Sequence, residues 1–174
     1  IYIPDVGDVD NTDIRVSHNI VRATGVAWGR IGIDLNGGVD RGTYRIWNNI
    51  VYDYINNYGI FVNRAGSVAY VYNNTVYNCG GGIIDNVGSS TRAKNNLVYN
   101  IVTPASTFYG TFHGDSDNNA TDSTDSTGQG VDLTEISVGF VDATGENFHL
   151  DAGDTDVINV GLDLSADTDL AISD

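Results

Sequence analysis

The chain has 174 residues, 41% hydrophobic and 18% charged, and its net charge of −15 comes from 23 acidic residues against eight basic ones. This length predicts a single domain, and the negative charge argues against nucleic acid or an anionic membrane as a partner because both repel it. No run approaches the roughly 18 apolar residues of a membrane span. The single cysteine, Cys79, excludes an internal disulfide and is expected to be buried filler.

Four copies of one pattern follow along the N-terminal part of the chain. Each copy has a run of β-branched and aromatic residues, an Asn-centred pair, a second short run, and then a Gly-led apolar run. The second residues of the four pairs are separated by 30, 25 and 22 positions: Asn19, Asn49, Asn74 and Asn96. Repeats of this length with strand-forming residues predict a solenoid, because each coil buries its apolar face only by stacking on its neighbours.

The Gly-led runs define a second repeated position. Three of them carry an Asn four residues after the Gly, at Asn36, Asn63 and Asn86. Equivalent residues of stacked coils lie above one another, so both sets of Asn are expected to form columns whose side-chain amides hydrogen-bond from coil to coil. We interpret these residues as structural.

The Asn pair followed by a Gly-Ile-x-Val-x-Asn strand, between about residues 14 and 112, resembles the repeats of pectate-lyase-like secreted polysaccharide-active proteins. The segment from Val141 to Leu150 is similar to the closing segment of many such proteins. The resemblance implies an all-β, right-handed parallel β-helix of about four to six coils. It also implies an extracellular or cell-surface location and a polysaccharide partner. It does not settle activity, because one fold serves many functions.

The predicted organisation is one domain with three parts. Residues 1–112 form the coils, residues 113–130 an acidic polar loop, and residues 131–174 the closing segment. The abrupt start at Ile1 and the polar end suggest a fragment of a longer protein. Exposed rung edges would then favour end-to-end or lateral self-association.

Clusters of acidic residues are candidate calcium sites, since Ca²⁺ takes hard oxygen ligands. The leading cluster lies in the predicted loop and contains Asp115, Asp117, Asn119 and Asp122. It begins like an EF-hand but has Ala120 where that loop needs Gly, so a solvated turn is the alternative. A second cluster contains Asp5, Asp8, Asp10 and Asp13 within nine residues. A third, looser group contains Asp151, Asp154 and Asp156.

A lyase would need a cation near a uronate carboxylate and a base at the adjacent carbon. The candidate catalytic residues are Arg64 and Lys94, with Asp34 and Asp85 in the Gly-led strands and Arg92, His113 and Asp115 nearby. Glycoside hydrolysis would instead pair Asp34 with Asp85. Either chemistry requires these residues to converge on one face.

Aromatic residues recur on nearly every coil and favour binding over catalysis. Phe61 and Phe112 are expected in the column of Asp34, and with His113 they are the candidate carbohydrate-binding residues. We therefore predict a non-catalytic binding or structural module that engages extracellular polysaccharide. The alternative is a polysaccharide lyase or glycoside hydrolase, with calcium as its one candidate cofactor.

Overall fold

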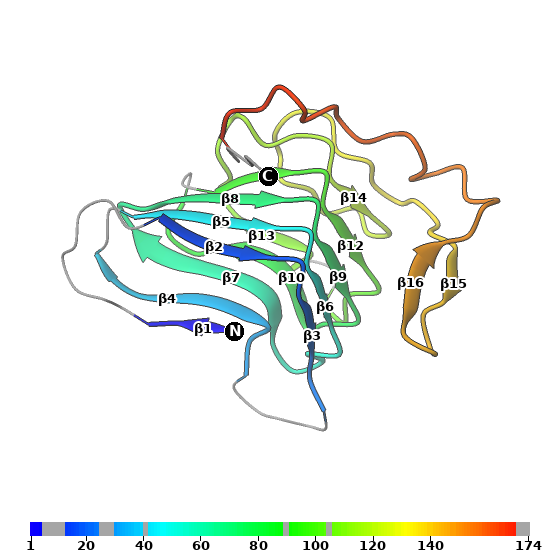
Figure 1. Ribbon diagram of the computed structural model, residues 1–174, viewed down its shortest axis with the longest axis horizontal. Coiled ribbons are helices and arrows are strands. Elements are labelled where there is room, and N and C mark those ends of the chain that lie inside the picture. Colours follow the sequence, from blue (N-terminus) through cyan, green and yellow to red (C-terminus); the bar gives the residue numbers. More distant parts are fainter. Residues whose placement is uncertain (5–12, 25–29, 40–41, 89–90, 104–105, 170–174) are drawn as a thin grey trace.

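The chain folds as stacked parallel β-sheets wound into a solenoid. The computed structural model describes residues 1–4, 13–24, 30–39, 42–88, 91–103 and 106–169. Sixteen strands occur in these residues, and fourteen of them lie in three parallel sheets (Figure 1). Among the same residues, no helix has the length and apolar character needed to cross a bilayer. Asp5, Asp8 and Asp10 of one predicted calcium cluster lie outside the described residues.

Three sheets, A, B and C, form the sides of the solenoid. Sheet A contains β1 (Tyr2–Ile3), β4 (Ile33–Val39), β7 (Tyr58–Ala65), β10 (Gly81–Asp85) and β13 (Phe108–Gly110). Sheet B contains β2 (Asp13–Ser17), β5 (Thr43–Trp47), β8 (Val68–Tyr72) and β11 (Thr91–Lys94). Sheet C contains β3 (Ile20–Arg22), β6 (Ile50–Tyr52), β9 (Thr75–Tyr77), β12 (Leu97–Tyr99) and β14 (Ala120–Thr121).

The chain visits the sheets in the order A, B, C and then begins the next turn. The solenoid has about three turns, slightly fewer than the expected four to six. Strands β4 to β12 supply three successive turns, and β1–β3 and β13–β14 extend the sheets at the two ends. The predicted all-β parallel solenoid is thus confirmed, with a small correction to the coil count.

Alternating side chains fill the interior. Ile33 and Leu35 on β4, and Ile60 and Val62 on β7, are fully buried because successive strand residues point to opposite faces. A Cβ at Gly59 would lie 2.3 Å from Val76 Cγ1, which explains why a glycine leads this run. The sequence pattern therefore encodes both the core and the corner where sheet A begins.

The corner between sheets B and C explains the paired asparagines. The first member of each pair has a positive φ between 54° and 58°, at His18, Asn48, Asn73, Asn95 and Asn118. Asn tolerates this left-handed conformation better than most residues do. The chain thus bends at the first residue of the pair and can use the second for hydrogen bonding.

The second members form a buried amide ladder. The Nδ2 atoms of Asn19, Asn49 and Asn74 each donate to the Oδ1 atom of the next rung's Asn at 3.0 Å. Asn96 continues the series by donating to Asn119 at 2.8 Å, and Asn119 donates to Asp132 Oδ1 at 3.1 Å. The predicted column is confirmed, and it ends on a carboxylate that only accepts hydrogen bonds.

A second ladder lies on the outside of sheet A. Asn63 Nδ2 donates to Asn36 Oδ1 at 3.0 Å, and Asn86 Nδ2 donates to Asn63 Oδ1 at 2.9 Å. The direction is opposite to that of the buried ladder, since here the later rung donates to the earlier one. The second predicted column is also confirmed.

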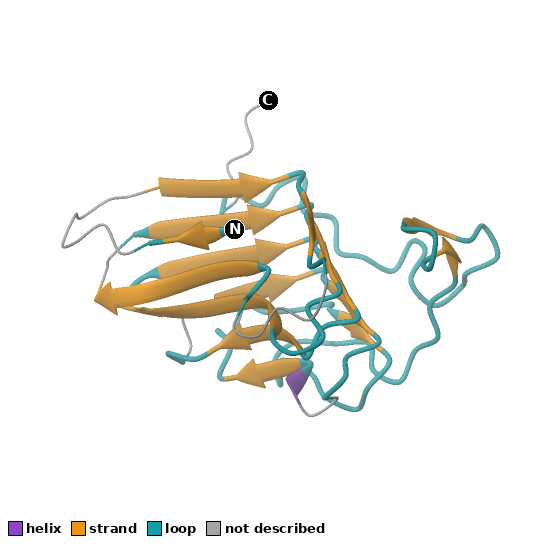
Figure 2. Cartoon of the chain, turned by 90° about the horizontal axis from the view of Figure 1, so that it is seen from below, coloured by secondary structure: helices purple, strands orange, loops and turns teal. Residues whose placement is uncertain are grey.

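The C-terminal segment leaves the solenoid and folds back along it. Strands β15 (Phe140–Asp142) and β16 (Asn147–Leu150) form an antiparallel hairpin beside sheet C (Figure 1). The chain then returns across sheet B, as the orange and red trace shows. Figure 2 shows the hairpin joined to the stacked strands by loops. The exterior of the solenoid is therefore partly covered by the chain itself.

Candidate functional site

Two columns of side chains point outward from sheet B. The pairing register aligns Arg15, Arg45, Tyr70 and Arg92 in one column, and Ser17, Trp47, Tyr72 and Lys94 in the other. The guanidinium carbons of Arg45 and Arg92 lie 5.5 and 5.4 Å from the Tyr70 ring centroid, within cation–π range. This face gathers four of the eight basic residues of the chain.

One end of this face carries a cation, an imidazole and a carboxylate in contact. Arg92 Nε donates to Asp115 Oδ2 at 3.2 Å, and Arg92 Nη2 lies 3.2 Å from His113 Nε2. His113 Nδ1 lies 3.2 Å from the same Asp115 oxygen. The fold thus brings together three residues that the sequence placed near a possible lyase centre.

The remaining predicted catalytic residues do not join this cluster. Arg64 is 0% exposed, and it donates to Tyr44 Oη at 3.0 Å and to the Ile3 carbonyl oxygen at 2.6 Å. Lys94 Nζ contacts Asp167 Oδ2 at 2.9 Å. Arg64 is thus placed inside the solenoid, away from any polymer bound outside it.

The side chains of Asp34 and Asp85 point to opposite faces of sheet A. Both belong to sheet A, but the register aligns Asp34 with Phe61 and Phe61 with Ile84, so Asp85 points to the opposite face. The Asp85 carboxylate is buried and accepts hydrogen bonds from the backbone N–H groups of Gly88 and Thr91 at 3.0 and 3.2 Å. The two carboxylates do not face each other across a common space.

The residues of the leading calcium cluster form part of a further rung. Asp117 forms a parallel bridge with Lys94, and Asn119 occupies the buried ladder. Asp115 pairs with Arg92, whereas Asp122 Oδ2 accepts the backbone N–H of Asn100 at 3.0 Å. In the described part of the chain, no group of three or more His, Cys, Asp or Glu is arranged to hold a metal ion. Calcium binding stays a prediction.

The third acidic group organises the loops around the hairpin. Asp154 Oδ2 accepts the Gly139 N–H at 2.7 Å, and its Oδ1 accepts those of Asp156 and Val157 at 2.9 and 3.0 Å. Partial burial acts to raise the pKa of Asp154, but these backbone hydrogen bonds outweigh it and hold the pKa below its ordinary value. This carboxylate therefore stabilises the turn that follows β16.

The C-terminal segment covers the outer faces of sheets B and C. On sheet C, the aligned rings of Tyr52, Tyr77 and Tyr99 receive Phe140 and Phe148 from the hairpin. The Phe148 ring centroid lies 4.9 Å from that of Tyr52 and 5.4 Å from that of Tyr77. These tyrosines, which could have formed an external sugar platform, pack within the protein.

On sheet B the cover is the C-terminal strap, which we define as residues 160–169. Leu164 packs against Trp47 and Tyr72, and Lys94 pairs with Asp167. Asn95 Nδ2 donates to the Leu162 carbonyl oxygen at 2.9 Å. The strap thus lies directly on the cationic and aromatic columns.

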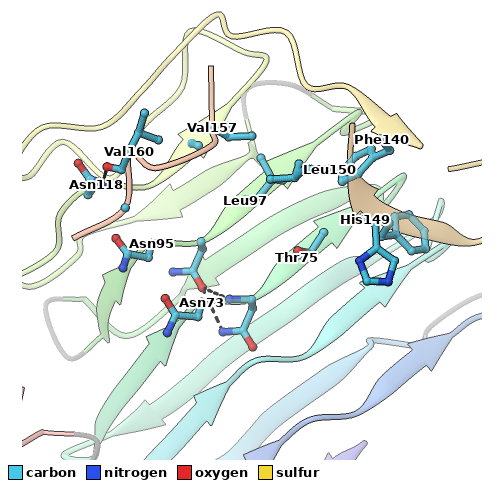
Figure 3. A pocket seen from close by; sticks show the side chains of 15 residues that line it. Asn73, Thr75, Asn95, Leu97, Asn118, Phe140, His149, Leu150, Val157 and Val160 are labelled. Carbon is cyan, nitrogen blue, oxygen red and sulfur yellow. Dashed lines mark hydrogen bonds between the residues drawn. The ribbon is translucent and has the colours of Figure 1, made fainter. Parts of the chain in front are cut away.

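A pocket of about 460 Å³ lies where the C-terminal segment crosses the corner between sheets B and C. Figure 3 shows its two walls: Asn73, Thr75, Asn95 and Leu97 from the solenoid, and Phe140, Leu150, Val157 and Val160 from the C-terminal segment. His149 also lines this pocket. One wall is rich in amides and the other is apolar, so the pocket is suited to a small amphipathic molecule.

Sheet A carries the most exposed aromatic column. The register aligns Tyr2, Asp34, Phe61, Ile84 and Tyr109 in one column on the side of the sheet away from the core. Ile84 is 1% exposed, so the exposed rings lie on either side of a buried residue. Tyr2 and Tyr109 are 64% and 55% exposed, and Phe61 stacks on Tyr58 with ring centroids 5.4 Å apart. The exposed Asn36–Asn63–Asn86 ladder runs alongside. The face therefore offers flat rings beside amide donors and acceptors.

The expected position of Phe112 in this column was wrong. Tyr109 pairs with Ile84 and takes that place, whereas Phe112 is 2% exposed and packs edge-to-face on Phe108 in the core. Gly110 does not lead its run as Gly59 and Gly82 do, because it aligns with Asp85 at the strand end. Its φ of 115° and a Cβ position only 1.9 Å from the Asp85 carbonyl oxygen explain why it is glycine.

The environment of Asp34 is unusual for an outward carboxylate. Its Oδ1 atom is buried and has no hydrogen-bond partner among the described residues. Burial raises the pKa of Asp34 above its ordinary value, and the positive charges of the N-terminal ammonium group and Arg64 reduce the size of this increase.

Sequence reasoning missed two features of the site. Asn118 and Asn119 are a fifth Asn pair, 23 residues after Asn96, and this spacing was visible in the sequence. The strap and the hairpin gave no comparable signal, because their contacts with the solenoid join segments far apart in the chain.

Comparisons with protein-family models, with curated proteins and with solved structures found no match for this chain. The parallel solenoid is therefore established by its own sheets, while kinship with the pectate-lyase-like proteins stays a prediction.

Proposed function

We propose that the protein is a non-catalytic polysaccharide-binding module of extracellular or cell-surface origin, and that the outer face of sheet A is its contact surface. The observation that carries this proposal is the column from Tyr2 to Tyr109 beside the exposed amide ladder. Aromatic faces pack against sugar rings, and amides satisfy sugar hydroxyl groups. Rungs spaced about 4.8 Å apart repeat these groups along the axis, which suits a polymer.

A binding assay with single substitutions tests this function. Immobilised neutral and uronic-acid polysaccharides would be titrated with the wild-type chain, with Phe61→Ala and with Tyr109→Ala. Loss of one stacking ring is worth about 1 kcal/mol, so each variant should bind roughly fivefold to tenfold more weakly. Val131→Ala is the control, since Val131 is 69% exposed and lies outside sheet A. Unchanged binding by both aromatic variants would refute the assignment of this face.

A second candidate is a polysaccharide lyase, favoured by the contact among Arg92, His113 and Asp115. An imidazole held between a cation and a carboxylate can move a proton, and the nearby cationic column could neutralise a uronate. His113 would be the base, and Arg92 would bind the carboxylate. Calcium, which the sequence suggested, would act by neutralising the same acid group.

Binding and catalysis can be distinguished by measuring whether new polysaccharide ends appear. The chain would be incubated with uronic-acid polymers, with calcium or with chelator, and unsaturated and reducing ends would be followed over time. Unsaturated ends that disappear in His113→Ala would establish the lyase. Reducing ends alone would indicate hydrolysis, and binding without new ends would leave the module non-catalytic.

A further inference from the structure

The outer face of sheet B recognises the C-terminal strap as a peptide. Asn95 Nδ2 donates to the Leu162 carbonyl oxygen at 2.9 Å, and Asn95 Oδ1 accepts the Leu162 N–H at 2.8 Å. Arg45 Nε donates to the Asp169 carbonyl oxygen at 2.7 Å. The Asn95 side-chain amide therefore binds both the N–H and the C=O of one strap residue, Leu162. The spacing of these two contacts matches the paired donor and acceptor of a peptide backbone.

Two side-chain contacts add a sequence preference. Leu164 packs against the rings of Trp47 and Tyr72. Three residues later, the Asp167 carboxylate pairs with Lys94 at 2.9 Å, with both side chains largely buried. The Asp167 N–H donates to the Leu164 carbonyl oxygen at 3.0 Å, so the two anchors are joined by a turn. The face therefore favours a segment in which a leucine precedes an acidic residue across a tight turn.

The strap does not satisfy everything that it covers. The indole nitrogen of Trp47 and the hydroxyl oxygen of Tyr72 are buried and have no hydrogen-bond partner in the described part of the chain. Trp47 is 6% exposed and Tyr72 is 0% exposed. Burial strongly raises the pKa of Tyr72, so its hydroxyl group stays a donor. Two buried donors without acceptors are costly, so a segment that supplied acceptors there would bind better than the strap.

The strap is also held loosely for a segment in contact with a sheet. None of its residues belongs to a strand. Val160 and Leu162 are 36% and 37% exposed, so much of their apolar surface stays in water. Such a segment opens more readily than the paired rungs beneath it.

We propose that the outer face of sheet B is a binding site for acidic, leucine-containing peptide segments that turn between the leucine and the acidic residue, and that the C-terminal strap is its displaceable occupant. The site is independent of the sheet A face, so either assignment can fail alone. A competing segment must supply backbone groups for Asn95, a leucine for the Trp47 and Tyr72 rings, and a carboxylate for Lys94.

The test uses the full chain with a weakened strap. Leu164→Ser combined with Asp167→Asn removes the two side-chain anchors and leaves the face intact. A fluorescent synthetic peptide with the sequence of residues 158–169 is the probe, and a scrambled peptide is its control. We expect the variant to bind the probe at least about tenfold more tightly than the wild type. In the variant, the strap of the same chain no longer competes with the probe for the site. Adding Lys94→Gln to the variant should reverse this gain, whereas adding Tyr109→Ala should not.

Hydrogen exchange makes each outcome decisive. We expect the Leu162 amide to exchange faster in the variant while the Asn74 amide of the buried ladder stays protected. Lost protection of the ladder would show that the strap is part of the folded core, and an unchanged Leu162 amide would show that it is not displaceable. A released face that ignores the peptide, or that binds a polyuronate in its place, would overturn the proposal.

Discussion

Single asparagine side chains hold adjacent rungs together. Asn96 Nδ2 donates to the Val71 carbonyl oxygen and to Asn119 Oδ1, while its own Oδ1 accepts from the backbone and side-chain nitrogens of Asn74. One residue thus satisfies groups from the rungs on both sides of its own. Buried polar groups that lose such partners are expensive to leave unpaired.

Replacing Asn96 by Ala should destabilise the fold by about 3 kcal/mol, because the Asn74 donors would be left buried without an acceptor. Denaturant unfolding at neutral pH measures the change. Asn63→Ala is the matched control: it also removes two ladder hydrogen bonds, but in an exposed ladder where water can replace them. Its cost should stay below about 1 kcal/mol, and equal losses in the two variants would contradict this account.

The buried carboxyl oxygen of Asp34 gives a prediction with a defined sign. Burial raises the pKa of Asp34 above its ordinary value of 3.8, so the folded state holds this proton more tightly than the unfolded state does. The resulting stability is complete below pH 3.8 and declines as the pH rises through the folded-state pKa.

Asp34→Asn, which resembles the protonated form, should therefore be more stable than the wild type at pH 7. The two proteins should unfold alike at about pH 3, where Asp34 is protonated in both states. Denaturant titrations at the two pH values check this. A variant that is less stable at neutral pH would show that the charge of Asp34 is well solvated or paired.

At the scale of elements, the β15–β16 hairpin supplies a lid for sheet C. Phe148 contacts Tyr52 and Tyr77, and Phe140 contacts Tyr77 and Tyr99. An outward column of rings is thereby converted into a second layer of packing. The hairpin is held by these aromatic contacts and by the Arg22–Glu146 ion pair, and within the described residues its two strands pair with each other and not with the solenoid.

Phe148→Ala should cost about 2 kcal/mol, since it removes a half-buried ring from a packed aromatic group. Thermal unfolding measures the loss, and Tyr52 and Tyr77 should become more accessible to a tyrosine-reactive reagent. Val141→Ala on the same hairpin is the control because that side chain is 54% exposed. Equal accessibility in the two variants would mean that the hairpin does not cover sheet C.

Elements built from local repeats could be predicted from the sequence, and those built from distant contacts could not. The Asn pairs and Gly-led runs reveal the rungs because each pattern has a local cause. The Asn pair forms the corner between sheets B and C, and the Gly-led run forms a strand of sheet A. Gly110 misled the register because it is glycine for another reason, namely a positive φ close to the Asp85 carbonyl. The Arg92–His113–Asp115 contact could be foreseen only as a set of residues, since the rung that joins them depends on pairing across the sheet.

For the whole molecule, the uneven distribution of charge has a structural role. All eight basic residues precede position 95, and fifteen of the 23 acidic residues follow it. The halves meet through ion pairs between Arg22 and Glu146 and between Lys94 and Asp167. The acidic half is thus attracted to the half that carries the cations.

Reversing the charge of one basic side chain on the outer face of sheet B should release the strap. Lys94→Glu places a carboxylate against Asp167, so the strap amides should exchange about tenfold faster while those of the ladder are unchanged. Arg15→Glu is charge-matched and lies on the same sheet, but Arg15 pairs with Asp13 and should leave the strap protected. Hydrogen exchange resolves the two cases, and equal effects would point to net charge alone.

The opposite directions of the two amide ladders determine how each tolerates chemical ageing. Asn36 precedes Gly37, the type of bond at which asparagine deamidates most readily, and its side chain serves the outer ladder as an acceptor. Conversion to aspartate would keep that acceptor, so the ladder would survive. The same conversion at Asn19, the first residue of the buried ladder, would set a carboxylate against the Asn49 oxygen and break that contact. Damage at the most reactive asparagine therefore falls where the fold can absorb it.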